Sequence, residues 1–130
     1  MSARGFKGLE VWQLSIELAK QSYLFTQKLP QSEQYGLTGQ IRRSSTSIPA
    51  NIAEGYGRRQ PGAYVQFLRI AKGSLNELET HLILCQELEI STVDSKVFDL
   101  IAEIGSKLSN LIDKVQSTVV KEEIASYNEN

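Results

Sequence analysis

Apolar residues recur every three or four positions along most of the chain, a spacing that places them on one face of an α-helix. Four such segments follow one another, and polar or helix-breaking residues separate them. The predicted helices span about residues 8–28, 36–56, 61–89 and 93–119. Residues 120–130 are expected to form a polar tail at the end of a single domain, 1–130.

All four segments show an apolar stripe that we expect to be buried, which in the second consists of Leu37, Ile41, Ile48 and Ile52. In the first, the stripe consists of Leu9, Trp12, Ile16, Ala19 and Tyr23. In the third, Pro61 suits the first turn, and the stripe is formed by Tyr64, Leu68, Ala71, Leu75, Leu78, Leu82 and Cys85. The fourth repeats the rhythm with Val97, Ile101, Ile104, Leu108, Leu111 and Val115.

The second segment is unusual because hydroxyl residues and a proline interrupt it. Proline lacks the amide donor and crowds the preceding turn, so a bend is expected at Pro49. The hydroxyls of residues 44–47 are expected to bond back to carbonyls of the preceding turn. Small residues here favour close packing against Gly73 and Ser74 of the third helix.

No alternating run of β-branched residues indicates a strand. Short connections make consecutive helices antiparallel neighbours. The sequence therefore predicts an all-α fold, an up-down-up-down antiparallel four-helix bundle in which helix 2 is kinked at Pro49.

Two helices carry more apolar residues than one stripe requires. The additional residues are Val11, Leu14, Leu18 and Phe25 in the first helix and Phe67, Ile70, Ile83, Leu84 and Leu88 in the third. One interpretation is a second contact surface for self-association. The alternative is a wide buried face with some apolar residues scattered outside it.

Composition indicates an ordinary globular protein, with 41% hydrophobic and 22% charged residues. The N-terminus shows no secretion signal, and no apolar run is long enough to span a membrane. The single cysteine, Cys85, agrees with a reducing compartment. We therefore expect a cytoplasmic protein without membrane contact.

The charges are unevenly distributed. Between residues 42 and 72 six basic residues face one acid, Glu54, a net charge of +5, whereas the whole chain carries −1. The basic residues, which are our candidates for nucleic-acid binding, are Arg42, Arg43, Arg58, Arg59, Arg69 and Lys72. We expect them on one edge between helices 2 and 3, with Arg42, Arg43 and Lys72 at a similar height. The alternative is that their stems cover apolar surface and their charges pair with acids such as Glu54.

Catalysis has little support in the sequence. His81 is the only histidine, and Cys85 lies on the apolar stripe, where a thiol is usually inert. Glu77, His81 and Cys85 follow one another at helical spacing, but one histidine cannot supply a bundle di-metal site. We expect no catalytic residue, no metal, no cofactor and no enzymatic activity.

Three motifs carry a resemblance to a known family. They are residues 47–55 (SIPANIAEG), Gly57-Arg58 and residues 67–80, together with the opening residues 6–12. The chain resembles the bacterial four-helix-bundle proteins encoded in 23S rRNA intervening sequences, over about residues 6–118. The resemblance implies a homo-pentamer. It also implies a distant likeness to the accessory protein of diversity-generating retroelements, which partners a reverse transcriptase and binds nucleic acid. Some members carry a ribosomal label that reflects gene location.

Two functional hypotheses follow. The first is an oligomeric bundle that binds RNA or DNA through the basic edge, as an accessory factor associated with a reverse transcriptase or the ribosome. The second is a protein–protein interaction scaffold that presents apolar and acidic faces to a protein partner without binding nucleic acid.

Overall fold

The computed structural model describes residues 2–129 and consists of helices joined by short connections. Its elements are the 3-10 helix η1 (Ser2–Gly8), α1 (Glu10–Thr26), the short 3-10 helix η2 (Gln31–Glu33), α2 (Leu37–Gly57), α3 (Pro61–Glu87) and α4 (Ser95–Glu129). No strand occurs among these described residues. The predicted all-α four-helix bundle is therefore confirmed.

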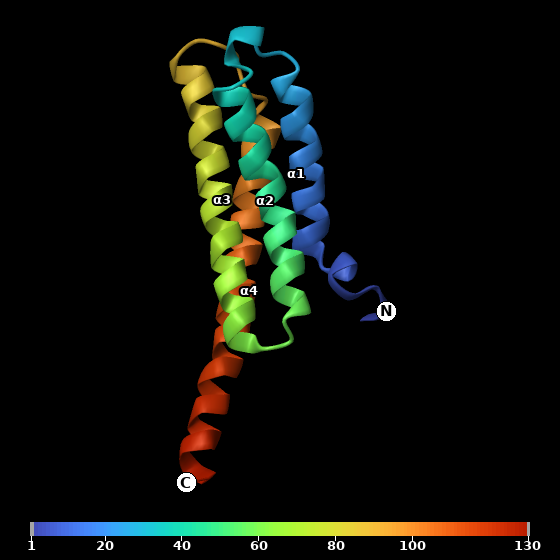
Figure 1. Ribbon diagram of the computed structural model, residues 1–130, viewed down its shortest axis with the longest axis vertical. Helices are drawn as coiled ribbons and strands as arrows, with labels where there is room; N and C mark the ends of the chain where they lie inside the picture. The colour runs from blue at the N-terminus through green and yellow to red at the C-terminus, as the bar shows by residue number, and fades with distance from the viewer. Residues whose placement is uncertain (1, 130) are drawn as a thin grey trace.

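The four helices pack side by side, and consecutive helices run in opposite directions along the long axis (Figure 1). Helix α2 lies between α1 and α3, and α4 lies behind it (Figure 1). Helix α2 continues through Pro49 as one helix from Leu37 to Gly57. The bend at Pro49 stays a prediction.

The core lies along the axis of the bundle. Its fully buried side chains include Leu18, Ile41, Ile48, Ile52, Leu68, Leu78, Leu82, Ile104 and Leu108. The buried faces of α3 and α4 follow the predicted stripes closely, although Tyr64, Leu111 and Val115 are only partly buried. A heptad-like pattern thus identified the packed faces of these two helices.

The predicted buried face of α1 is wrong in part, although Leu9 and Trp12 do pack against the core. Ile16 and Tyr23, which were expected inside, are 43% and 40% exposed. The buried face instead consists of Val11, Ser15, Leu18, Ser22, Phe25 and Thr26. Val11, Leu18 and Phe25, considered above for a second contact surface, are thus part of the core.

Two serine hydroxyls explain why α1 buries this face and not the predicted one. Ser15 Oγ donates to the carbonyl oxygen of Val11 at 2.7 Å, and Ser22 Oγ donates to that of Leu18 at 2.8 Å. A hydroxyl bonded within its own helix can be buried at little cost, because it leaves no unpaired donor. Both serines therefore lie in the core, and small side chains there let neighbouring helices approach.

Helix α4 is longer than predicted. It continues from residue 119 to Glu129, through the segment expected to be a polar tail. This segment contains no glycine or proline, and it carries good helix formers such as Lys121, Glu122 and Glu123. Its last turns project beyond the bundle, away from the other three helices (Figure 1). Over residues 2–129, no helix is both long and apolar enough to cross a membrane.

Candidate functional site

The hydroxyl-rich segment of α2 is bonded within its own helix. Ser44 Oγ donates to the Gln40 carbonyl oxygen at 2.8 Å, and Ser45 Oγ and Thr46 Oγ1 donate to that of Arg42 at 2.9 and 3.0 Å. The predicted back-bonding to the preceding turn is confirmed for Ser44, Ser45 and Thr46, whereas Ser47 Oγ bonds to Ser74 Oγ of α3 instead. These hydroxyls are satisfied, so the segment has a structural role in α2.

Helices α2 and α3 are joined through a polar contact at mid-height. Ser47 Oγ lies 2.8 Å from Ser74 Oγ, and Asn51 Nδ2 donates to the Ser47 carbonyl oxygen at 2.7 Å. Ser74 thus does contact α2, but through Ser47 and not through Ser44, Ser45 or Ala50, which were expected to allow its approach. The prediction for Gly73 is wrong, because the space around this residue is open.

Three of the six candidate basic residues are engaged within the bundle. Arg42 Nε donates to Thr26 Oγ1 at 2.9 Å, and its guanidinium lies 4.7 Å from the centre of the Tyr23 ring. Arg58 Nη2 lies 2.7 Å from Glu54 Oε1, and its guanidinium lies 5.1 Å from the Phe67 ring centre.

The third engaged residue is Lys72, whose ammonium donates to Ser109 Oγ of α4. These contacts match the alternative in which basic side chains cover neighbouring helices and pair locally.

The other three, Arg43, Arg59 and Arg69, are exposed. Within residues 2–129 none of them takes part in an ion pair. Arg43 lies over Gly39 in the upper part of α2, and Arg59 lies in the α2–α3 connection with a positive φ of 60°. Arg69 faces α4 in the lower half of α3. These three arginine side chains therefore lie in separate regions of the surface.

The contacts also separate Arg42 from Lys72. Arg42 contacts α1, on one side of α2, whereas Lys72 contacts α4, on the far side of α3. Because Ser47 and Ser74 lie at one level, Arg42 lies about 10 Å above Lys72 along the bundle axis at about 1.5 Å per residue. The structure thus does not place the six residues on one edge. Their role in binding nucleic acid stays a prediction.

A small hollow of about 230 Å³ lies beside the α2–α3 connection, lined among others by Tyr56, Arg59, Tyr64 and Val115. The buried Tyr64 hydroxyl has no hydrogen-bond partner within the described residues. Burial, followed by the nearby Tyr56, raises the pKa of Tyr64 to about 12. The phenol is therefore neutral at ordinary pH and ill-suited to proton transfer there.

The residues considered for chemistry, Glu77, His81 and Cys85, do not form a reactive cluster. His81 Nε2 lies 3.7 Å from Glu77 Oε1, which is too long for a hydrogen bond. Cys85 is buried, and burial, followed by the Glu33 carboxylate, raises the pKa of its thiol. Across the described part of the chain, no three His, Cys, Asp or Glu side chains gather as metal ligands would.

Exposed apolar side chains flank α2 on both sides. We call this surface the α2 face. It comprises Ile16 and Tyr23 of α1, Thr46 and Ala50 of α2, and Ile70, Leu84 and Leu88 of α3. Tyr23 lies beside α2 because Arg42 covers its ring, and Ile70 lies one turn from Ser74, which contacts α2. Between these two apolar borders the middle of α2 exposes Thr46 and Ala50, with Arg43 and Glu54 one turn to either side. A partner helix can approach closely at Thr46 and Ala50.

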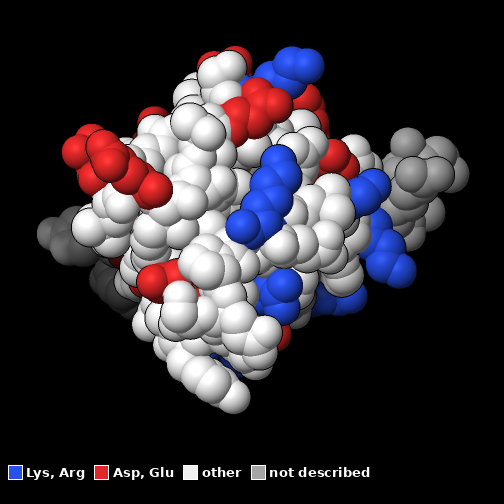
Figure 2. Space-filling model, turned by 90° about the horizontal axis from the view of Figure 1, so that it is seen from above, with Lys and Arg blue, Asp and Glu red and all other residues white. Residues whose placement is uncertain are grey.

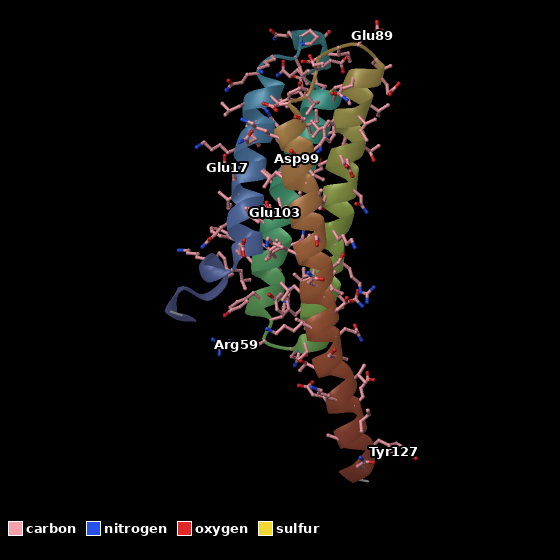
Figure 3. The ribbon with its side chains drawn as sticks, turned by 180° about the vertical axis from the view of Figure 1, so that it is seen from behind. Glu17, Arg59, Glu89, Asp99, Glu103 and Tyr127 are labelled. Atoms are coloured by element: carbon pink, nitrogen blue, oxygen red, sulfur yellow. The ribbon has the colours of Figure 1, made fainter. Side chains whose placement is uncertain are left out.

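The opposite side of the bundle is acidic. Glu17 of α1 and Asp99 and Glu103 of α4 lie on the side away from α2 (Figure 3). Lys107 lies among these acids, with its Nζ 3.3 Å from Glu10 Oε1. Seen from the end that carries η2, acidic side chains lie on the left of the view, and both kinds of charge meet at the top and on the right (Figure 2).

The fold and these surfaces define a small all-α bundle protein with an apolar face and an acidic face. The chain belongs to the family of 23S rRNA-intervening sequence proteins, whose family model matches residues 7–114. The predicted resemblance is thereby confirmed. A comparison with the curated proteins finds no match. The likeness to the retroelement accessory protein stays a prediction.

Proposed function

We propose that this chain is a non-enzymatic protein that assembles into a homo-oligomer through the α2 face. The observation that carries the proposal is the pair of exposed apolar borders, on α1 and α3, with small residues of α2 between them. Covering one half-exposed Ile or Leu side chain contributes about 1 kcal/mol. Several such side chains on one face favour association of copies. The family resemblance implies five subunits.

The absence of an enzymatic role is part of the proposal. The chemistry-bearing groups are either buried, as Cys85 is, or held neutral at ordinary pH, as Tyr64 is. An active site needs titratable groups that converge on a cavity at a suitable pKa. A binding or assembly role requires only surfaces, and these are present.

Light scattering on two matched variants tests the assembly face. Ala50→Arg places a long charged side chain in the centre of the α2 face, and Ala102→Arg makes the same change on exposed α4. Both substitutions keep a good helix former, so both chains should fold. We expect Ala50→Arg to lower the mass to that of a monomer and Ala102→Arg to keep the parental mass. A monomeric parent protein, or an unchanged mass for Ala50→Arg, would contradict the proposal.

A second candidate function is the binding of RNA or DNA, with a reverse transcriptase or ribosome as the associated machinery. The observation in its favour is that Arg43, Arg59 and Arg69 are exposed and outside the ion pairs of residues 2–129. An oligomer would repeat these cations around its axis and increase its attraction for phosphate.

Fluorescence anisotropy with labelled RNA and DNA at two salt concentrations tests this candidate. Arg59→Gln with Arg69→Gln should weaken binding and flatten the salt dependence. Lys107→Gln is the matched control, because Lys107 already lies between two acids, Glu10 and Glu103. If neither nucleic acid binds at low salt, the chain acts as a protein–protein interaction scaffold, with the acidic α1–α4 side available to a basic partner.

A further inference from the structure

The projecting end of α4 carries an apolar stripe that nothing covers within the described chain. Val120, Ile124 and Tyr127 follow one another at spacings of four and three residues and are 44%, 57% and 82% exposed. Tyr127 extends from the last turns, far from the other helices (Figure 3). A helix of about ten unsupported residues is marginally stable in water. Packing of this stripe against another surface would stabilise the projecting segment, residues 119–129.

A hollow between α3 and α4 continues along α4 to this stripe, and we call the whole depression the α3–α4 groove. Its upper part, about 400 Å³, lies between the two helices and is lined mainly by Arg69, Lys72, Gly73, Ser109 and Asp113. Its lower part, about 470 Å³, is formed by α4 alone, with Asp113, Gln116, Ser117, Val120 and Lys121. Asp113 belongs to both, and Val120 belongs to both the groove and the stripe. The bare backbone at Gly73 leaves the upper part open.

We propose that residues 119–129 of one copy dock in the α3–α4 groove of a second copy, as an antiparallel pair with its two-fold axis at Val120. Stripe and groove lie along one face of α4, so the same surface on each copy is self-complementary. A two-fold pair needs this property, because each copy offers and receives the same residues.

The dimensions of α4 fit this arrangement. Tyr127 and Asp113 each lie seven residues from Val120, which is about 10 Å along the helix. In the antiparallel pair, Tyr127 of one copy therefore lies at the level of Asp113 of the other. The contact between Lys72 and Ser109 places Arg69, one turn below Lys72, at the same level. Tyr127, at the end of each stripe, thus lies beside the Asp113 carboxylate and the Arg69 guanidinium of the other copy.

The charges and polar groups are complementary as well. The groove carries Arg69 and Lys72 against Asp113, whereas the projecting segment carries Glu123 beside its stripe. None of Arg69, Asp113, Lys121, Glu122 and Glu123 takes part in an ion pair within the described chain. The Tyr127 hydroxyl can donate to the Asp113 carboxylate, and its ring can stack on the Arg69 guanidinium.

This pairing does not rest on the proposed function, because it uses α3 and α4 and leaves the α2 face free. If the α2 face also assembles, the pair joins two such assemblies and doubles their mass. The two contacts can therefore be removed separately.

Disulfide trapping tests the two-fold axis. In a Cys85→Ser background, Val120→Cys places two thiols opposite each other on the axis, within the reach of a disulfide. Ala102→Cys, also exposed on α4, is the matched control. Under mild oxidation we expect most Val120→Cys chains to form covalent dimers and few Ala102→Cys chains to do so. Equal cross-linking of the two variants would overturn the proposal.

Further substitutions test the occupants of the groove in the same assay. Tyr127→Ala with Ile124→Glu, and separately Arg69→Glu, should lower the yield of Val120→Cys dimers at least fivefold. Ala50→Arg should leave that yield unchanged, which separates this pairing from assembly through the α2 face. Undiminished dimers in both groove variants would show that the thiols meet without docking in the groove, and would overturn the assignment.

Discussion

Gly55 of α2 lies in contact with Phe67 of α3, and a methyl group at residue 55 would lie 2.6 Å from Phe67 Cβ. The same methyl group would lie 3.0 Å from Tyr64 Cδ1. Neither neighbour can yield easily, because the Phe67 Cβ is fixed to the α3 backbone. The absence of a side chain at Gly55 therefore sets how closely α2 and α3 approach near their connection.

Gly55→Ala is expected to destabilise the fold. Overpacking of this kind typically lowers the free energy of unfolding by about 1–3 kcal/mol. Gly73→Ala is the control, because it lies inside α3 with open space around it and should raise the free energy of unfolding by about 1 kcal/mol. Urea denaturation of both variants measures the difference. Equal effects would show that helix propensity alone acts at residue 55.

The buried face of α1 can be tested with two leucines. Leu18 is fully buried, and Leu24 is 53% exposed. Leu18→Ala should lower the free energy of unfolding by about 2–5 kcal/mol through lost burial and a cavity. Leu24→Ala should cost less than about 1 kcal/mol. A larger loss for Leu24→Ala in denaturant titration would contradict the observed orientation of α1.

Arg42 is expected to contribute to stability. Arg42→Met keeps an apolar stem but removes the hydrogen bond to Thr26 and the contact between the guanidinium and the Tyr23 ring. We expect a loss of about 1 kcal/mol in the free energy of unfolding. Arg43→Met, on the next residue, should change it by less than about 0.5 kcal/mol. Thermal melts of both variants, followed by circular dichroism, compare them; equal melting temperatures would rule out the structural role.

Tyr64 is expected to make stability depend on alkaline pH. Its pKa is about 12 in the fold, above the ordinary value of 10. Between these values the folded state holds a proton that the unfolded state has lost, so stability falls as pH rises from 10 to 12. Tyr64→Phe removes this group and should flatten the decline. Denaturation midpoints measured from pH 9 to pH 12 provide the test, and parallel curves for both proteins would contradict the assignment.

The sequence by itself determined the fold class and the packed faces of α2, α3 and α4, including Ile41, Ile48 and Ile52 of α2. In α4 the apolar residues form one stripe, and a single stripe has only one way to face a core. In α3, which carries additional apolar residues, the stripe with the most residues is the buried one. The family motifs also lie in the sequence, so the family was identified before the fold.

In α1 the sequence offered two stripes, and only the tertiary structure decided between them. The chosen face contains Ser15 and Ser22, which look like surface residues until their hydroxyls are seen to bond within the helix. A hydrophobicity pattern treats such residues as exposed, because it carries no information about hydrogen-bond partners. The helical end of α4 was not predicted for a related reason. Residues 120–130 are mostly polar and were therefore expected to form a tail, although Val120, Ile124 and Tyr127 keep helical spacing.

The basic residues show most clearly that closeness in the sequence does not determine which face of the bundle a side chain lies on. Arg42 and Arg43 are neighbours in the chain, yet Arg42 packs on α1 whereas Arg43 is exposed. Successive residues on a helix point about 100° apart, so charge counted along a segment is divided among different faces. Composition therefore determined how much positive charge residues 42–72 carry, and the packing of four helices decided which of those charges are paired.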